Sequence, residues 1–301
     1  MIIRDQPSAL RLFLVMQGSV VPRIFGKIVA VALLSVAILL IDQRGVRLPR
    51  ISVAATSVFG VALSLFLGFR NNAAYDRWWE ARKLWGGIIG GVRTLARDAT
   101  IFLRDPADRA DLLDHATAFA HLHRHALRGR GMPGPDDLSL EPEPAQAMLA
   151  CRNPADAALR AAGECIGALR TSGELSDFGQ MTMARTLAEL GAAQAGGERI
   201  ATTPLPFVYS LLVRRTTYLY CFLLPFALID AANWLTPVFV AAVAYTFFGL
   251  QTVTHELEHP FGIGANALPL DALCRVVDTS VAEALGRPAP EPLRPVNYLL
   301  L

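Results

Sequence analysis

The sequence HELEH, in which His255 and His259 flank two glutamates, matches the H-E-x-x-H pattern. On a helix, histidines at i and i+4 share a face and can both bind zinc, and the first glutamate, Glu256, can serve as a general base. An enzyme of this type needs a third ligand, for which Asp230 and Asp271 are the nearby candidates, and neither lies in a convincing motif. The next residue is a proline, which ends the helix where that of such an enzyme continues. The pattern leaves open an intramembrane zinc protease or a polar helix end without metal.

A second histidine cluster, HLHRH, occupies residues 121–125. On a helix His121 and His125 share a face, where they could bind a metal or sense pH. The simpler interpretation makes them surface residues of a helical bundle, with His123 on its apolar side. The sequence contains no P-loop, no dinucleotide-binding fingerprint and no G-x-S-x-G motif. We therefore expect no catalysis and no cofactor.

The composition indicates a membrane protein. Of the 301 residues, 53% are hydrophobic, and the mean hydropathy of +0.37 exceeds that of most soluble domains. The net charge of +2 does not suggest the concentrated basic face of a nucleic-acid-binding domain. The four cysteines are scattered without a C-x-x-C pair, so a disulfide framework is not expected and a reducing compartment suffices.

Four uncharged apolar runs predict four transmembrane helices. The clearest, Ile51–Phe69, has nineteen residues, about the number that a helix needs to cross a hydrocarbon layer of roughly 30 Å. The other three are Ile28–Ile41, Thr216–Ile229 and Leu235–Thr254. No proline follows Ile51–Phe69, so we expect this helix to leave the lipid and to continue in water to about Trp85.

The region between the second and third spans reads as a soluble helical bundle. It shows apolar residues at a spacing of three to four and no strand signal. Cap and breaker residues predict helices over about 108–127, from an N-cap at Asn153 to a break at Ser172-Gly173, and over about 174–195 with a stop at Gly196-Gly197. Residues 266–285 predict one more helix.

These patterns divide the chain into four segments. They are an N-terminal segment with transmembrane helices 1–2 (1–81), a cytosolic helical region (82–203), transmembrane helices 3–4 (204–258), and a cytosolic C-terminal helix and tail (259–301). The loop 231–237 has no Lys or Arg, whereas the N-terminal segment contains Arg4, Arg11, Arg23 and Lys27. The positive-inside rule therefore places both termini and the helical region in the cytoplasm, although the basic residues of the first loop favour the opposite orientation.

One apolar stripe runs along the second span. Val61, Leu65 and Phe69 fall at i, i+4 and i+8 and lie on one side of the helix. By themselves they could simply face lipid. The small residues between them would let neighbouring helices approach closely; they are Gly60, Ala62, Ser64 and Gly68.

Three separated stretches resemble the bestrophin family, particularly its bacterial members. They are FLGFRNNAAYDRWWEARKLWG (66–86), TTPLPFVYSLLVRRTTYLYCFLLPFAL (202–228) and ELEHPFGIGANALPLDALC (256–274). Together with the MIIR start they cover most of the chain in the family's order. The resemblance implies an ion channel built as a homopentamer, with four spans and a helical cytosolic region in each subunit around one axial pore.

The resemblance also implies roles for particular residues. In the family the second span lines a narrow apolar neck, at positions that correspond here to Val61, Leu65 and Phe69. A second, cytosolic aperture is formed by the residue between two prolines, here Leu205 between Pro204 and Pro206. Stacked apolar rings of this kind can gate by dewetting.

One departure concerns calcium. Calcium-gated animal members carry an acidic run after the equivalent of His259-Pro-Phe-Gly262, whereas this chain continues with IGANALP. Hard oxygen ligands are missing from that run, so we expect no calcium clasp there.

The sequence therefore predicts an all-α membrane protein: four transmembrane helices plus a cytosolic helical bundle, assembled as a homopentamer in the bacterial inner membrane. Its function would be passive transport of chloride or another anion, or of a monovalent cation. Its expected partners are further copies of itself, membrane lipid and permeant small ions, and no nucleic acid. The alternatives are the zinc protease and a non-conducting membrane scaffold.

Overall fold

The computed structural model describes residues 1–3, 15–16, 18–129, 131, 133–134, 138 and 140–301. Across these residues the regular secondary structure is helical, and strand-like pairing is limited to two isolated bridges, Ile2 with Leu299 and Val296 with Leu299. The predicted all-α class is thus confirmed for the described part of the chain. Arg4 and Arg11, on which the predicted orientation partly depends, lie outside it.

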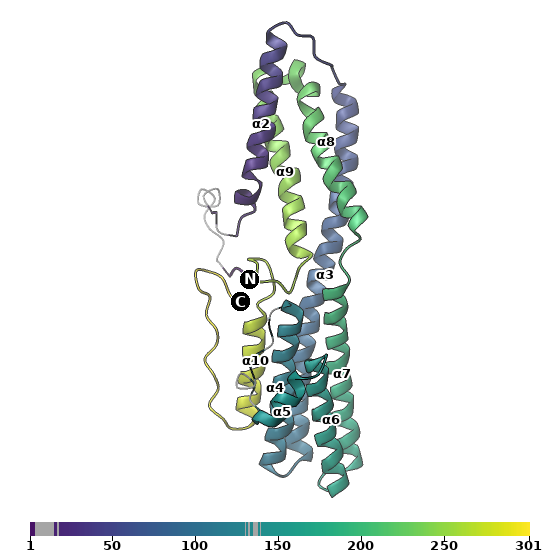
Figure 1. Cartoon of the computed structure of the whole chain (residues 1–301), viewed down its shortest axis with the longest axis vertical. Coiled ribbons are helices and arrows are strands. Elements are labelled where there is room, and N and C mark those ends of the chain that lie inside the picture. The colour runs from purple at the N-terminus through teal and green to yellow at the C-terminus, as the bar shows by residue number, and fades with distance from the viewer. Residues whose placement is uncertain (4–14, 17, 130, 132, 135–137, 139) are drawn as a thin grey trace. The chain divides into compact units, whose positions relative to one another are not determined.

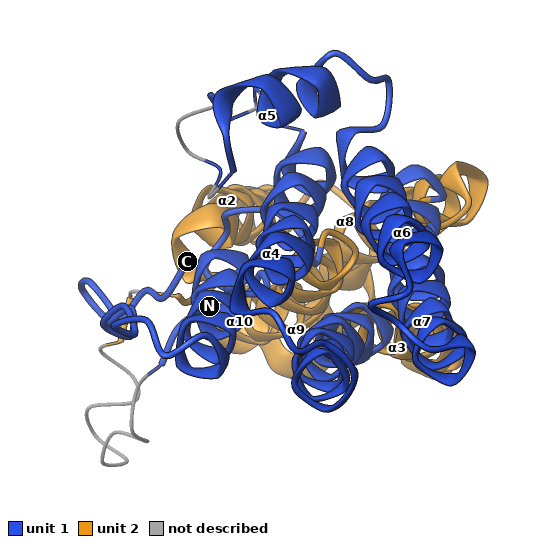
Figure 2. Cartoon of the chain, turned by 90° about the horizontal axis from the view of Figure 1, so that it is seen from below, with its two compact units in different colours: residues 1–4, 79–203, 260–301 blue, residues 5–78, 204–259 orange. Residues whose placement is uncertain are grey.

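The chain forms two compact units, coloured separately in Figure 2. Unit 1 comprises residues 1–4, 79–203 and 260–301, and unit 2 comprises residues 5–78 and 204–259. Each unit therefore combines segments that are far apart in the sequence. The long helix α3 (Val53–Phe102) contributes its first part to unit 2 and its second part to unit 1.

Unit 2 is built from apolar helices that lie side by side (Figure 1). They are α2 (Val21–Gln43), the first part of α3, α8 (Phe207–Ala232) and α9 (Thr236–Leu257). A 3-10 turn, η2 (Asn233–Leu235), joins α8 to α9. Leu63 and Leu67 of α3 pack in one buried cluster with Tyr220 of α8 and Val240 of α9. The side chains of this cluster hold α3 against the other two helices.

By length and composition, three helical segments of the described chain can cross a membrane: Val21–Gln43, Val53–Phe102 and Phe207–Leu257. The last of these contains both α8 and α9. Helix α3 is continuous, as predicted, but it extends beyond the expected end near Trp85 to Phe102. Its 50 residues contain no proline and measure about 75 Å at 1.5 Å per residue.

Unit 1 contains the second part of α3 and five further helices among its described residues. They are α4 (Pro106–Arg128), α5 (Pro142–Leu149), α6 (Pro154–Ser172), α7 (Asp177–Thr202) and α10 (Leu270–Ala284). Local sequence explains the ends of α6: the Asn153 side chain accepts a hydrogen bond from the Asp156 amide, and Gly173 closes the helix at φ +84°. Both ends were predicted from the sequence.

The predicted stop at Gly196-Gly197 is wrong. Helix α7 continues through both glycines to Thr202, because here glycine allows close packing and does not end the helix. A Cβ added at Gly196 would lie 2.8 Å from Leu84, and one at Gly197 would lie 2.8 Å from Nε2 of the buried His123. Neighbouring side chains therefore occupy the space that any larger residue would need.

We predict that Gly197→Ala destabilises unit 1 and that Gly191→Ala, in the same helix, does not. The added methyl group at residue 197 meets the ring of His123, which stacks between Trp85 and Phe119 and cannot move away. Overpacking of this kind costs about 1–3 kcal/mol. Gly191 has no neighbour within 4 Å of an added Cβ, so its replacement by alanine should be neutral or stabilise the helix by roughly 0.5–1 kcal/mol.

Thermal unfolding of the two purified variants, followed by circular dichroism, measures both effects. A melting temperature for Gly197→Ala equal to or above that of Gly191→Ala would contradict this account of the close packing.

Candidate functional site

Helix α3 presents two apolar faces of very different exposure. Leu63 and Leu67 are 2% and 0% exposed, whereas Val61, Leu65 and Phe69 are 69%, 56% and 57% exposed. The first pair faces the cluster shared with α8 and α9, so the predicted stripe lies on a side that this chain does not cover. Such a stripe fits a pore lining, a contact with another copy, or a lipid contact.

The small residues beside the stripe differ in their role. At Gly60 an added Cβ would lie 2.5 Å from the Tyr220 hydroxyl, so glycine is needed there for the contact between α3 and α8. At Gly68 nothing lies within 4 Å. The predicted close approach of helices is thus found at one end of the stripe within this chain, and the other end stays open.

Leu205 lies in the short connection between α7 and α8. Helix α7 ends at Thr202 and α8 begins at Phe207, and Leu205 is a half-buried residue in a bend between two prolines. Each proline fixes its own φ and restricts the residue before it. Leu205 therefore follows a residue of fixed φ, Pro204, and is itself restricted by Pro206, as the sequence predicted.

The end of α9 contains two carboxylates that are held by arginines. Glu258 accepts bonds from Arg70 Nε at 3.1 Å and Arg70 Nη2 at 2.6 Å, both to Oε1. Arg70 is 4% exposed, and its charge is therefore compensated where water is scarce. Arg77 donates from Nε to the Glu258 carbonyl at 3.0 Å, and Glu256 is paired with Arg23.

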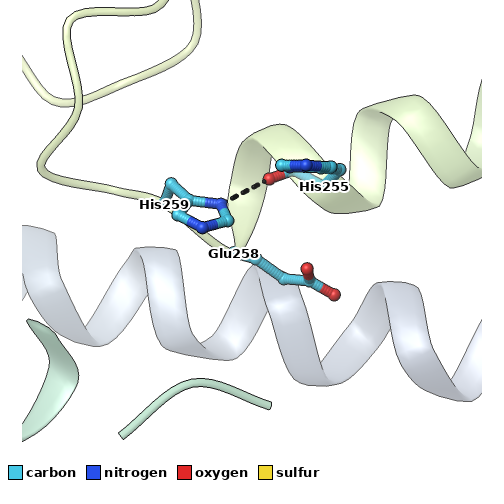
Figure 3. A group of neighbouring side chains, drawn as sticks. All are labelled: His255, Glu258 and His259. Carbon is cyan, nitrogen blue, oxygen red and sulfur yellow. Dashed lines mark hydrogen bonds between the residues drawn. The ribbon is translucent and has the colours of Figure 1, made fainter. Parts of the chain in front are cut away.

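These ion pairs change the interpretation of HELEH. Glu256, which would be the base of a zinc protease, pairs with Arg23. The carboxylate that lies close to both histidines is that of Glu258. One ligand atom from each of His255, Glu258 and His259 lies within 4.8 Å of the others. Figure 3 shows the three side chains at the end of α9 and the bond between Nδ1 of His259 and the carbonyl of His255, 3.0 Å long. The structure thus brings together three possible metal ligands, and the carboxylate of Glu256 is engaged elsewhere and does not serve as a base.

The two aspartates considered as third ligands have other partners. Asp230 is paired with Arg50 at 3.0 Å. Asp271 is paired with Arg128 at 2.7 Å and with Arg124 at 3.0 Å. Neither belongs to the histidine cluster.

The second histidine cluster is held by neighbours on all three rings. His121 Nε2 bonds to Asp278 Oδ1 at 2.6 Å, and His125 Nε2 accepts from Arg124 at 2.8 Å. Both are half-buried, so the expectation of surface residues was only partly right. His123 is 1% exposed, as expected for the apolar side, and burial lowers its pKa to about 4 although nearby Glu198 acts in the opposite direction.

The long apolar helices of unit 2 and the helical unit 1 define the class: in its described residues the chain is a helical membrane protein with an uncovered apolar stripe on α3, the longest of the described helices. A family model described as Bacterial/Fungal Bestrophin protein matches residues 1–283. A voltage-dependent anion channel-forming protein of Mesorhizobium japonicum is 46% identical over 97% of this chain and 95% of its own length. A protein of the same description from Escherichia coli is 38% identical, over 94% and 93% respectively.

Solved structures of similar proteins support the same family. The crystal structure of a bacterial bestrophin homologue from Klebsiella pneumoniae, phased on zinc, is 37% identical and superposes with a TM-score of 0.82, covering 88% of this chain and 99% of that chain. The chain belongs to the bestrophin family, as the three sequence stretches indicated.

Sequence reasoning missed the pairing of Arg70 with Glu258. A signal was present, since Arg70 directly follows a nineteen-residue uncharged run and a charge at that depth needs a partner. The partner itself is 188 residues away, and no local pattern identifies it.

We predict that the stability of unit 1 falls as the pH drops from 6.5 to 4, and that His123 contributes to the loss. Because the pKa of His123 is about 4 in the folded protein and 6.5 in its ordinary state, the unfolded chain binds a proton over this range and the folded chain does not. The linked loss reaches about 3 kcal/mol at pH 4 and is absent above pH 7.

The measurement is the free energy of unfolding against pH for the wild type and for His123→Leu, which lacks the titrating group. The variant should show a shallower pH dependence, whatever its stability at neutral pH. Equal slopes in the two proteins would exclude a contribution from His123.

Proposed function

We propose that this protein is a bestrophin-type anion channel that works as a homopentamer, with a neck lined by Val61, Leu65 and Phe69. The observation that carries the proposal is the exposed apolar stripe on α3, in a chain whose relatives are named as anion channel-forming proteins. A stripe that one chain leaves open suits a surface that five copies turn toward a common axis.

We propose four membrane spans: α2, the first part of α3, α8 and α9. The turn Asn233–Leu235 supports this count, because α8 and α9 lie side by side on either side of it (Figure 1). The lack of Lys and Arg in 231–237 supports an external turn, with both termini in the cytoplasm of a bacterial cell and the chain in its inner membrane.

In this proposal residues 1–81 and 204–258 belong to the membrane part, and 82–203 and 259–301 are cytosolic. The boundaries of the two compact units after residues 78, 203 and 259 support it, whereas residues 1–4 group with unit 1.

The neck would act through dehydration. Five copies of the stripe form three stacked apolar rings, and a narrow apolar tube holds water poorly, so an ion must lose part of its hydration shell to pass. Leu205, with its backbone constrained by Pro204 and Pro206, would form a second aperture on the cytosolic side.

Charge next to the neck does not set selectivity in this proposal. Arg70 directly follows Phe69, but Glu258 compensates it within 2.6 Å, so the pair adds little net field. Apolar rings then favour ions that release water most easily, which are large anions of low charge density. The expected order places iodide and nitrate before chloride.

The test is ion flux through the purified protein in liposomes, with chloride and sodium gradients applied separately and reversal potentials recorded. We expect the reversal potential to follow the chloride gradient. A potential that follows the sodium gradient would replace the anion assignment by a cation channel. Absence of flux from both the wild type and a widened-neck variant would exclude a channel and favour a membrane scaffold.

We predict that Phe69→Ala and Leu65→Ala raise single-channel conductance several-fold, because each removes bulk from a ring that restricts the pore. Phe66→Ala is the matched control: Phe66 is also an exposed phenylalanine of α3, at 47%, but it lies about 100° from Leu65 and 60° from Phe69 around the helix, on the side that lines a pocket with Leu212 and Thr216 of α8. Planar-bilayer recordings measure the three variants. Equal conductance of Phe69→Ala and Phe66→Ala would place Phe69 outside the pore.

A further inference from the structure

We propose that His255, His259 and Glu258 form a binding site for a divalent transition metal of the zinc class at the C-terminal end of α9. The site is a non-catalytic one, because Glu256 is bound by Arg23. The proposal does not depend on the channel function, since it concerns a ligand cluster within unit 2 alone.

The spacing of the three groups carries the proposal. Their ligand atoms lie within 4.8 Å of one another, and in a tetrahedral zinc site ligand atoms lie about 3.3 Å apart, at bond lengths near 2.0 Å. His255 is an exposed side chain, so rotation of its ring can shorten its distances to the other two groups without moving the backbone. The fourth position faces solvent and would hold water.

Hydrogen bonding prepares His259 as a ligand. Its Nδ1–H donates to the carbonyl of His255 at 3.0 Å. This bond leaves the lone pair on Nε2, and it fixes the ring in the way that a carbonyl partner orients metal-binding histidines.

Glu258 is fixed in place but keeps one oxygen for a metal. Both bonds from Arg70 end on Oε1, and Arg77 anchors the Glu258 carbonyl. The second oxygen, Oε2, can bind the metal while Arg70 stays on the first. The positive charge of Arg70 opposes a cation, so we expect weaker binding than in a closed four-ligand structural site.

The donors determine the class of metal. Two imidazoles and one carboxylate suit zinc, nickel, copper and cobalt, whereas calcium and magnesium prefer oxygen ligands alone. The site also precedes Pro260 and uses none of the residues after Gly262, so it differs from an acidic calcium-binding run in both place and chemistry.

The chain contains its own comparison. His121 and His125 have the same i, i+4 spacing on α4, but Asp278 and Arg124 engage their Nε2 atoms and Gly131 accepts from Nδ1 of His125. Among the described residues, the same spacing therefore leaves Nε2 of His259 available at the end of α9, whereas Nε2 of both His121 and His125 is engaged on α4.

The test is isothermal titration of zinc chloride into the purified full-length protein in detergent, with calcium present in excess. We expect one saturable zinc per chain that calcium does not displace. His255→Ala and His259→Ala should each weaken binding at least about tenfold, and Glu258→Gln should weaken it in the same direction. Glu256→Gln and the double variant His121→Ala/His125→Ala should bind zinc as the wild type does.

Cobalt(II) provides a second readout, because a low-symmetry four-coordinate site gives strong visible absorption that should be lost in His255→Ala. If Glu258→Gln fails to fold because Arg70 loses its partner, the two exposed histidines still decide the matter. No zinc binding by the wild type, or equal binding by the double variant His255→Ala/His259→Ala, would overturn the proposal. Loss of binding in Glu256→Gln but not in Glu258→Gln would make Glu256 the carboxylate ligand and would overturn the assignment of Glu258.

Discussion

Helix α3 has more apolar surface than one chain can bury, and the organisation of unit 2 depends on that imbalance. Leu63 and Leu67 are covered by α8 and α9, while Val61, Leu65 and Phe69 remain more than half exposed. In water, an uncovered apolar stripe on a long helix would cause association. In a membrane it can face lipid, another copy or a pore, and the last of these is the role that we propose for it.

Ion pairs mark the places where the apolar helices of unit 2 end. Arg70 pairs with Glu258, Arg23 with Glu256, and Arg50 with Asp42 at 2.8 Å. Each arginine lies at or just beyond an end of an uncharged run, where isolated charge is costly. The pairing lets α3 continue past Phe69 without an uncompensated charge, and it engages Glu256, which the H-E-x-x-H pattern had suggested as a base.

The two histidine clusters show how far spacing alone carries an argument about sites. Both have histidines at i and i+4, on α4 in one case and in the other across the end of α9, which stops at Leu257. What distinguishes them is the set of partners that other helices supply: Asp278 of α10 engages His121, whereas Arg70 of α3 holds Glu258, beside His255 and His259, by one oxygen. The difference is a property of the folded chain, because the residues that decide it lie on elements distant in sequence.

The sequence by itself determined most of the helices, both ends of α6 and the family, but it did not predict α5. Uncharged runs, the Asn153 cap and Gly173 act through neighbouring residues, so a local pattern suffices to predict them. It also identified the stripe on α3, because helical periodicity alone puts Val61, Leu65 and Phe69 on one side. Tertiary structure decided the role of Gly196 and Gly197, the partner of Arg70 and the pairing of Glu256 with Arg23. Each of these depends on contact with a side chain on another segment, at a distance that no local periodicity encodes.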